Sequence, residues 1–247
     1  MRLKTGFMLL AVDIGNTRSK AAVFKDSKLL ERYVFPKNEL KQNLLSILAA
    51  RPEISGIVLS SVGHESIDFA LPSGVNVHAI SHKSRFPFQN LYETPHTLGI
   101  DRMVLASGAT LAFPGTNRLV IDAGTCITYD FVDDRDRYHG GAISPGIRLR
   151  YEALHNYTAK LPLLQAEMPA GFIGQSTAGS IHAGVVYGVL NEIDGFIEQY
   201  SKSAENFIII LTGGDAEFLA NRLKNTIFAN PNFLLESMER IFIQNTK

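Results

Sequence analysis

Residues 9–20 read Leu9-Leu10-Ala11-Val12-Asp13-Ile14-Gly15-Asn16-Thr17-Arg18-Ser19-Lys20, an apolar strand that enters a tight polar turn and returns. Asp, Gly and Asn tolerate turn conformations, and a glycine lets backbone N–H groups face outward without a Cβ in the way. Donors gathered at such a turn form an anion site, so we expect a nucleotide phosphate here. The Asp13 carboxylate would repel that phosphate unless it held Mg2+ directly or through the water shell of the metal. The alternative is a plain β-hairpin with this turn sequence.

The same pattern returns later in the chain, as Arg118-Leu119-Val120-Ile121-Asp122-Ala123-Gly124-Thr125-Cys126-Ile127-Thr128-Tyr129-Asp130. It again has an apolar strand, an Asp-x-Gly turn, polar residues and a second strand. Self-similarity at so long a separation predicts two halves of like topology, which we place at residues 1–114 and 115–247. Two facing Asp-x-Gly hairpins can hold one triphosphate between them.

Two further segments belong to the second half. Residues 207–216 predict a β-branched strand, then the pair Gly213-Gly214, where the backbone can approach a flat ring or a ribose, and then the start of a helix. A long helix is predicted from apolar residues at three- and four-residue steps, with Thr177 before it as a helix cap. The apolar positions are Ile181, Val185, Val189, Ile193, Phe196, Ile197 and Tyr200. Gly179, Gly184 and Gly188 within it predict close packing against another element.

Composition excludes several classes of partner. Lys and Arg together number 24, as do Asp and Glu, so no net field would attract nucleic acid or an anionic membrane. The longest apolar runs are too short to span a bilayer, so we expect no membrane segment. The single cysteine, Cys126, rules out an internal disulfide, fits a cytoplasmic protein and is expected to be a small buried hydrophobe. The P-loop and dinucleotide-binding glycine motifs are both missing from the sequence.

The middle of the first half adds a possible second site. An amphipathic helix is predicted to begin near Leu98, which puts Asp101 and Arg102 on its first turn. By themselves these residues indicate an ordinary helix-start acid and a solvated cation. The loop before the helix contains prolines and Tyr92. We expect this loop to lie over another part of the protein or over a ligand. The charged segment 133–137 reads as a solvated turn.

Three strand-turn pieces in this order resemble the superfamily of acetate and sugar kinases, Hsp70 and actin, and within it the type III pantothenate kinases. The closer resemblance rests on segments that span nearly the whole chain in the family's order. They are residues 13–20, Leu98-Gly99-Ile100-Asp101-Arg102, Asp122-Ala123-Gly124-Thr125, 140–147, 158–162 and Ile173-Gly174-Gln175-Ser176-Thr177. The resemblance implies an α/β, duplicated actin-like (ribonuclease H-like) fold. Two mixed sheets with flanking helices would then enclose an active site in the cleft between them.

The resemblance also implies an activity: ATP-dependent phosphorylation of pantothenate to 4′-phosphopantothenate, the first step of coenzyme A biosynthesis. It implies Mg2+ with ATP, a monovalent cation (K+ or NH4+) on Asp122, and a homodimer. Asp101 would be the general base, and the Arg102 guanidinium suits the substrate carboxylate. By motif position, the resemblance implies that ATP would be bound by Asp13, Ile14, Gly15, Asn16, Thr17, Arg18, Ser19, Lys20 and Thr125. Pantothenate would be bound by Tyr92, Gly99, Ile100, Asp101, Arg102 and Thr177.

The sequence departs from the family pattern at two places. Cys126 stands where small residues such as Ala are common, and Gln175-Ser176-Thr177 stands where Lys-Asn-Thr is common. The second change removes a basic side chain, and with it one expected contact to ATP or substrate. Another small-alcohol kinase or a phosphohydrolase of the superfamily would share the hairpins but lack Gly99-Ile100-Asp101-Arg102. A catalytically silent regulator would be expected to lose Asp13, Asp101 or Asp122, and all three are present.

Overall fold

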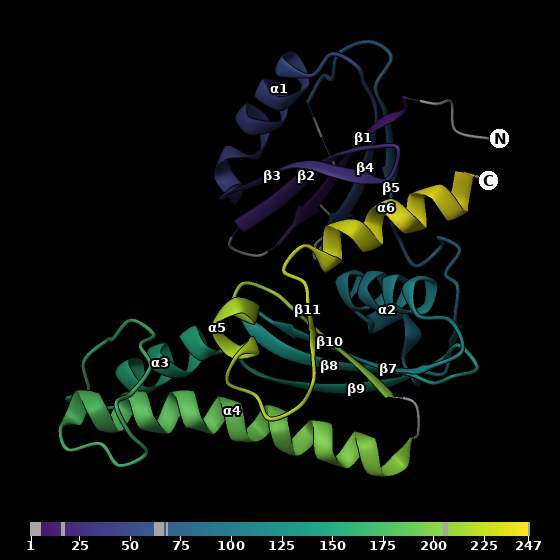
Figure 1. Cartoon of the computed structure of the whole chain (residues 1–247). Coiled ribbons are helices and arrows are strands. Elements are labelled where there is room, and N and C mark those ends of the chain that lie inside the picture. Colours follow the sequence, from purple (N-terminus) through teal and green to yellow (C-terminus); the bar gives the residue numbers. More distant parts are fainter. Residues whose placement is uncertain (1–5, 16–17, 62–66, 68, 205–206, 247) are drawn as a thin grey trace. The chain divides into compact units, whose positions relative to one another are not determined.

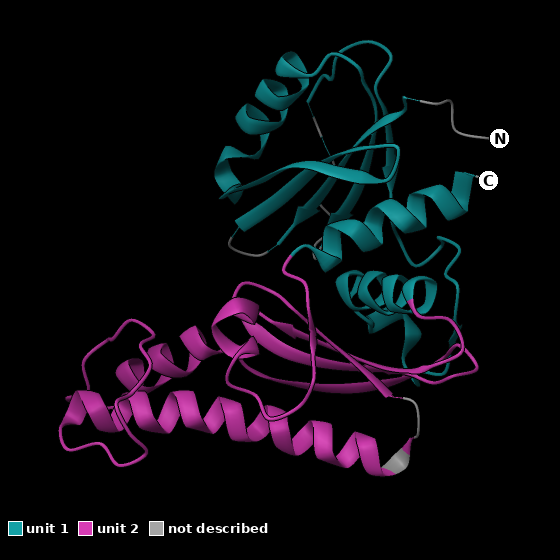
Figure 2. Ribbon diagram, in the orientation of Figure 1, with its two compact units in different colours: residues 1–112, 232–247 teal, residues 113–231 magenta. Residues whose placement is uncertain are grey.

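The computed structural model describes residues 6–15, 18–61, 67, 69–204 and 207–246. The chain forms two compact units, shown in different colours in Figure 2. Unit 1 comprises residues 1–112 and 232–247, and unit 2 comprises residues 113–231. The C-terminal segment therefore packs with the first half of the chain, whereas our halves at 1–114 and 115–247 assigned residues 236–242 to the second.

Unit 1 is built on a mixed sheet of five strands in the order β3-β2-β1-β4-β5. The strands are β1 (Met8–Ile14), β2 (Arg18–Lys25), β3 (Lys28–Pro36), β4 (Ile54–Ser61) and β5 (Asn76–Ala79). β1 is buried along its whole length, because it lies between antiparallel β2 and parallel β4. Leu10 and Val12 of β1 share a core with Leu44 of helix α1 (Leu40–Ala50), so α1 covers that face of the sheet (Figure 1).

Two other helices complete unit 1. Helix α6 (Phe233–Thr246) packs against α2 (Ile100–Ala112) and against β1 and β4. The α2–α6 contact is close at Gly108, where a Cβ would lie 1.7 Å from the Ser237 hydroxyl. The predicted helix is confirmed, but every residue of α2 from 102 to 110 is buried rather than one face alone, because α6 packs against it as well. The short elements are η1 (Lys37–Glu39), β6 (Gln89–Asn90) and η2 (Pro95–Thr97).

Unit 2 repeats the arrangement of unit 1. Its strands are β7 (Asn117–Ala123), β8 (Cys126–Val132), β9 (Arg137–Pro145), β10 (Phe207–Thr212) and β11 (Phe228–Ala229). They run in the order β9-β8-β7-β10-β11, with β7–β8–β9 antiparallel and β10 parallel to both β7 and β11. The order and directions match β3-β2-β1-β4-β5, so the duplicated α/β fold with two mixed sheets is confirmed.

The long helix of unit 2 is α4 (Thr177–Ser203), which lies along one face of the sheet (Figure 1). Its Val185, Val189 and Ile193 share a core with Leu119 and Ile121 of β7, as the sequence period predicted. Helices α3 (Ile147–Asn156) and α5 (Ala216–Ala220) complete the unit. No helix in the described part of the chain has the length and apolarity that a membrane crossing needs.

Three local predictions were wrong. Ser176, not Thr177, caps α4, because its hydroxyl accepts the Gly179 N–H at 3.0 Å. Cys126 is exposed rather than buried, since it opens β8 next to the turn. Gly184 has no neighbouring atom within 4 Å of where its Cβ would be, so close packing does not explain it.

The charged turn after β8 is ordered by hydrogen bonds rather than solvated throughout. The fully buried Arg118 guanidinium donates to Asp136 at 2.9 Å and to the Phe113 carbonyl at 3.1 Å. The Asp133 carboxylate accepts from the backbone N–H and the side chain of Arg137, at 2.8 and 2.6 Å, and lies 2.9 Å from a ring nitrogen of His139. Burial alone would raise the pKa of the Asp133 carboxyl, but these hydrogen bonds outweigh burial and lower it to about 2.

This lowered pKa predicts a pH-dependent stability. Because the folded pKa lies below the ordinary value of 3.8, the contribution of Asp133 is complete above about pH 5 and is lost as the pH falls towards 2. At neutral pH it should be about 2 kcal/mol, from 1.36 kcal/mol per pKa unit. We expect Asp133→Asn to melt below the wild type at pH 7 and close to it at pH 2. A melting difference that stays constant over this range would contradict the assignment.

Candidate active site

The first hairpin places Asp13 at the end of β1. Asp13 pairs with Lys20 on β2 and with Ser60 on β4, so the three side chains share one face of the sheet. That face is opposite to the one on which Val12 and Ile14 pack, and Asp13 is only 6% exposed there. Beyond β1, the Gly15 N–H donates to the Arg18 carbonyl at 3.2 Å, and a Cβ on Gly15 would lie 2.8 Å from that oxygen. The turn is therefore tight enough to require glycine.

The remaining members of this predicted ATP-binding set lie around the turn. Ile14 and Ser19 are buried and paired with each other across β1 and β2. Arg18 is exposed and Lys20 is half-buried. Asn16 and Thr17 lie outside the described residues.

The start of α2 brings together residues predicted to bind pantothenate. Asp101 lies in the first turn, as predicted, and its Oδ1 accepts the N–H of Arg102 at 2.9 Å. A Cβ on Gly99 would lie 2.4 Å from the same oxygen, so glycine leaves room for the carboxylate. Ile100 opens the helix and is half-buried.

Arg102 is not the solvated cation that its helix position suggested. It is 6% exposed, and its guanidinium lies 5.7 Å from the centre of the Tyr92 ring, within the range of a cation–π contact. The half-buried Tyr92 comes from the loop before the helix, where its own N–H donates to the Asn90 side chain at 2.9 Å. A carboxylate, a guanidinium and an aromatic ring are thus gathered at one helix start.

The second hairpin lies in unit 2, where two glycine turns close around residues 122–125. Gly146 donates its N–H to the Thr125 carbonyl at 3.0 Å, and a Cβ there would lie 2.0 Å from the Gly124 carbonyl oxygen. On the other side, Gly213 follows β10, whose last residue pairs with Asp122. A Cβ on Gly213 would lie 2.2 Å from the Ala123 carbonyl oxygen and 2.5 Å from Asp122 Oδ1. Thr125 is exposed at the tip, and Asp122 is half-buried.

Gly213 gives a direct test of this packing. Its φ of +100° is strained for any residue with a Cβ, and the carbonyl of Ala123 fills the space that the Cβ needs. We expect Gly213→Ala to destabilise the protein by about 2 kcal/mol or more and to weaken nucleotide binding. The matched control is Gly214→Ala, because no atom lies within 4 Å of that Cβ position. Equal melting temperatures for the two variants would contradict this account.

Thr177 is the residue of unit 2 that was predicted to contact pantothenate. It is exposed at the first position of α4 and lines a cavity of about 880 Å³ between α3 and α4. Tyr157, Leu161 and Gly184 line the same cavity, which is mainly apolar. Gly184 therefore borders open space, which accounts for its lack of packing neighbours.

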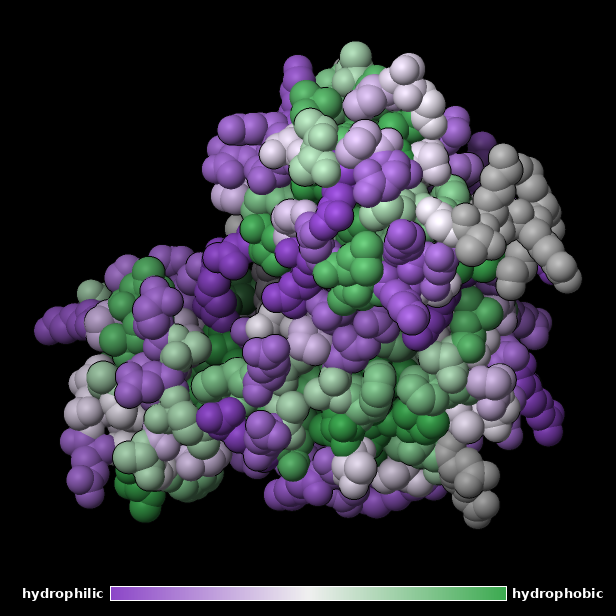
Figure 3. All heavy atoms as spheres, turned by 45° about the horizontal axis from the view of Figure 1, so that its top comes forward, coloured by the Kyte–Doolittle hydropathy of each residue, from purple (hydrophilic) through white to green (hydrophobic). Residues whose placement is uncertain are grey.

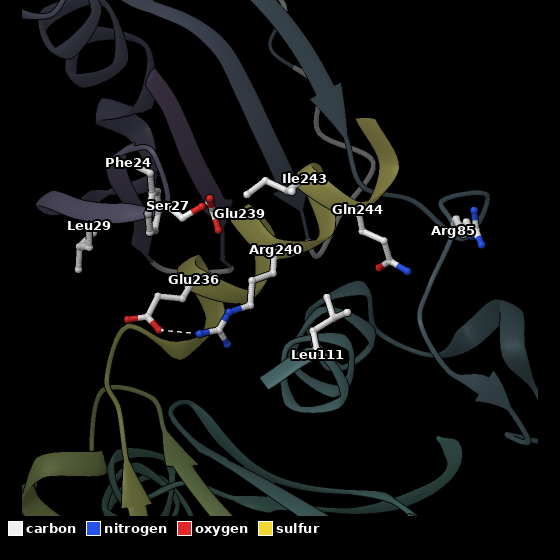
Figure 4. Close-up of a pocket in the computed structure, with 10 residues that line it drawn as sticks. All are labelled: Phe24, Ser27, Leu29, Arg85, Leu111, Glu236, Glu239, Arg240, Ile243 and Gln244. Atoms are coloured by element: carbon white, nitrogen blue, oxygen red, sulfur yellow. Dashed lines mark ion pairs between the residues drawn. The ribbon is translucent and has the colours of Figure 1, made fainter. Parts of the chain in front are cut away.

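A different cavity, of about 750 Å³, lies in unit 1 beside α6 (Figure 4). The side chains drawn there come from α6, the β2–β3 hairpin, the end of α2 and Arg85, and Glu236 pairs with Arg240 at 3.8 Å. Burial raises the pKa of the Glu239 carboxyl on its wall. None of the residues predicted for ATP or pantothenate lines this cavity, so it carries no part of the candidate site.

Unit 2 contains a polar cluster that was not predicted from the sequence. Glu192 of α4 accepts hydrogen bonds from the hydroxyls of Tyr129 and Ser144 and from the Arg150 guanidinium. A glutamate between the apolar Leu190 and Ile193 of α4 was the available signal, because charged side chains seldom lie on the buried side of a helix without a partner.

Solved structures of other proteins have a fold similar to that of this chain. The fold is that of the actin-like sugar kinases. It is similar to that of a ROK family glucokinase from Streptomyces griseus, with a TM-score of 0.55, 11% identity, and coverage of 95% of this chain and 98% of that one. A Baf family protein from Campylobacter jejuni has a TM-score of 0.61, 21% identity, and coverage of 96% and 98%. At these identities the likeness concerns the fold alone.

Comparison of sequences gives the family. Residues 9–199 match the family model described as type III pantothenate kinase. Type III pantothenate kinases of Flavobacterium johnsoniae and Flavobacterium psychrophilum are 62% and 57% identical over 237 residues. The alignments cover 95% of this chain in both cases, and 97% and 98% of the relatives. The chain belongs to the type III pantothenate kinase family and is a phosphotransferase.

Proposed function

We propose that this protein transfers the γ-phosphoryl group of ATP to the hydroxyl of pantothenate, the first step towards coenzyme A. Family membership supports the reaction, and the start of α2 carries the argument for the site. Pantothenate has a primary hydroxyl to be phosphorylated and a carboxylate to be held. Asp101 and Arg102 supply a carboxylate and a guanidinium at neighbouring positions, and Tyr92 packs on the guanidinium.

Each residue then has a part in the transfer. Asp101 orients the hydroxyl and takes its proton as the new O–P bond forms and the bond to the ADP oxygen breaks. Arg102 binds the substrate carboxylate through parallel N–H donors, and its burial strengthens that attraction. The backbone turn at Gly15 and the exposed Thr125 hydroxyl bind the phosphates of ATP. Thr177 adds a contact to pantothenate. That both units contribute to one cleft stays a prediction.

The residues present fit Mg2+ delivered with ATP. The described part of the chain holds no cluster of three or more His, Cys, Asp or Glu side chains suited to a metal. Mg2+ commonly binds through one or two carboxylates, substrate phosphates and water rather than an all-protein cage, and the carboxylate of Asp13 at a strand end suits that mode. The metal would neutralise charge on the transferring phosphoryl group.

Asp122 is proposed to hold a monovalent cation, K+ or NH4+. Its carboxylate lies against the Gly213 turn, beside the hairpin proposed to face the phosphates, so a bound cation would offset repulsion between like charges. We expect low activity in Na+ or Tris alone and a rise when K+ is added. The measurement is initial rate against salt at constant ionic strength. Equal rates in all these salts would remove the cation from the scheme.

The substrate is tested by ADP release with pantothenate against a panel of sugars and short hydroxy acids. Pantothenate should be phosphorylated with the highest kcat/KM. The second candidate is another small-alcohol kinase, because the fold is similar to that of a glucokinase. A higher kcat/KM for a sugar than for pantothenate would favour this second candidate. ATP hydrolysis without an acceptor would indicate a phosphohydrolase, and no turnover with any acceptor would indicate a silent regulator.

A homodimer and a cytoplasmic location belong to the same proposal. Hydrophilic and apolar residues are interspersed over the face seen in Figure 3. The segment before α4 nevertheless exposes large apolar side chains, among them Tyr157 (89%), Phe172 (72%) and Ile173 (82%). Such exposure in one segment favours a partner that covers it, and we propose that this partner is a second copy of the chain.

The proposed cytoplasmic location rests on Cys126. Its exposed free thiol is compatible with a reducing cytoplasm.

A further inference from the structure

The Glu192 cluster joins three elements of unit 2 to the middle of α4. Glu192 Oε1 accepts from the Tyr129 hydroxyl of β8 at 2.9 Å and from the Ser144 hydroxyl of β9 at 2.5 Å. Glu192 Oε2 accepts from the Arg150 guanidinium of α3 at 2.5 Å. The side chains of Arg150 and Glu192 are 22% and 24% exposed, so solvent screens the ion pair only partly.

The cluster has a fixed pattern of donors and acceptors. Burial would raise the pKa of the Glu192 carboxyl, but the hydrogen bonds from Ser144, Arg150 and Tyr129 outweigh burial and lower it. Burial, together with the bond to Glu192, raises the pKa of the Tyr129 hydroxyl. At neutral pH the carboxylate therefore stays charged, and all three partners donate to it.

The cluster continues to the second hairpin through a short covalent and hydrogen-bonded path. Besides Glu192, Arg150 holds the Pro145 carbonyl, to which its Nε donates at 2.9 Å. The next residue, Gly146, donates its N–H to the Thr125 carbonyl and lies against the Gly124 carbonyl. Glu192 thus fixes Ser144 directly and Pro145 through Arg150, and these two residues lead into the glycine that supports Gly124-Thr125.

We propose that Glu192 is a positioning residue for the Gly124-Thr125 turn, and hence for the ATP phosphates that this turn binds. The inference rests on the proposed function. Glu192 contacts no substrate in this scheme; it acts through Ser144, Arg150 and Gly146. Its loss changes the placement of the turn, which affects ATP more than pantothenate. A residue that only fastened α4 to the sheet would affect stability without this selectivity.

The test compares Glu192→Gln and Ser144→Ala with the control Glu152→Gln, all in the full chain. Glu192→Gln keeps the size of the side chain and removes the charge that holds Arg150, and Ser144→Ala removes one hydroxyl. Glu152 belongs to an exposed ion pair with Arg148 on the same helix α3, at 2.8 Å, and has no part in the cluster. Initial rates with each substrate varied, ATP binding by calorimetry and thermal melting are measured for every variant.

Because displacing a positioned group by about 1 Å can cost as much as 10²-fold, we expect kcat/KM for ATP to fall about 10–100-fold in Glu192→Gln. Calorimetry should show weaker ATP binding, KM for pantothenate should stay within about twofold, and Glu152→Gln should match the wild type. Ser144→Ala should show a smaller loss of the same kind, and the double variant should be no worse than Glu192→Gln, because both act through one path.

The proposal would be overturned if Glu192→Gln had a lower melting temperature but bound ATP and turned over with the wild-type kcat/KM. Glu192 would then have a purely structural role. An equal loss for both substrates with unchanged ATP binding would also overturn the proposal. Should Glu192→Gln fail to fold, Ser144→Ala alone decides by the same criteria. A wild type that binds ATP but does not phosphorylate pantothenate would refute the proposed function instead, while ATP binding by the variants would still test the positioning role.

Discussion

Asp101→Asn should lower kcat by about 10²–10⁴-fold while ATP binding stays close to that of the wild type. An alcohol is a weak nucleophile, and a positioned general base typically contributes a factor of this size, about 3–5 kcal/mol of barrier at 1.36 kcal/mol per tenfold. The asparagine keeps the size of the side chain and an oxygen that can accept the Arg102 N–H, as Oδ1 of Asp101 does at 2.9 Å. The start of α2 should therefore persist while the base is lost.

Single-turnover rates, ATP calorimetry and thermal melting separate the two possible roles of Asp101. Glu39→Gln is the matched control, since Glu39 is a carboxylate at the start of α1 and has no predicted catalytic part. It should turn over as the wild type does. An Asp101→Asn protein that melts early but retains its kcat would reduce Asp101 to a helix-start acid.

The strands and the duplication could be predicted because their signals are local. Apolar runs that end in Asp-x-Gly turns occur at β1 and at β7. Both strands are central in their sheets and have equivalent neighbours, β2 and β4 for β1 and β8 and β10 for β7. The period of α4 likewise identified its buried face. Each of these inferences needs only residues within one or two elements.

Long-range packing could not be read in the same way. The apolar face of α6 predicts that the helix packs against another element. The sequence of α6 alone does not identify that element as α2 of unit 1. Arg102 is buried, and Tyr92 contacts its guanidinium from a loop; the period of a helix does not contain such a contact. The cap of α4 fell on Ser176 rather than Thr177 because both residues can cap, and the choice depends on which hydroxyl meets the Gly179 N–H.

For the candidate site, the sequence predicted the residues of the turns better than the residues that hold those turns in place. Gly213 was expected to let the backbone approach a ligand; in the structure Gly213 and Gly146 both lie where a Cβ would strike the second hairpin. Glu192 was missed, because the partners that make a buried carboxylate tolerable come from β8, β9 and α3. Their meeting depends on the tertiary fold.

Asp13→Asn should raise the Mg2+ concentration needed for half-maximal activity by about 10–100-fold, the usual cost of losing a group that orients a metal or its ligands. A neutral amide is a poorer ligand than a carboxylate for a hard cation, whether contact is direct or through water. Asp13 is 6% exposed and is paired with Lys20 of β2 and Ser60 of β4, so the isosteric asparagine should preserve the strand and the melting temperature within a few degrees. The measurement is initial rate against free Mg2+ at saturating ATP, with Glu53→Gln, an exposed carboxylate before β4, as the control. Wild-type turnover in Asp13→Asn with unchanged Mg2+ dependence would remove Asp13 from the metal site and leave the hairpin as a turn that binds phosphate through its backbone alone.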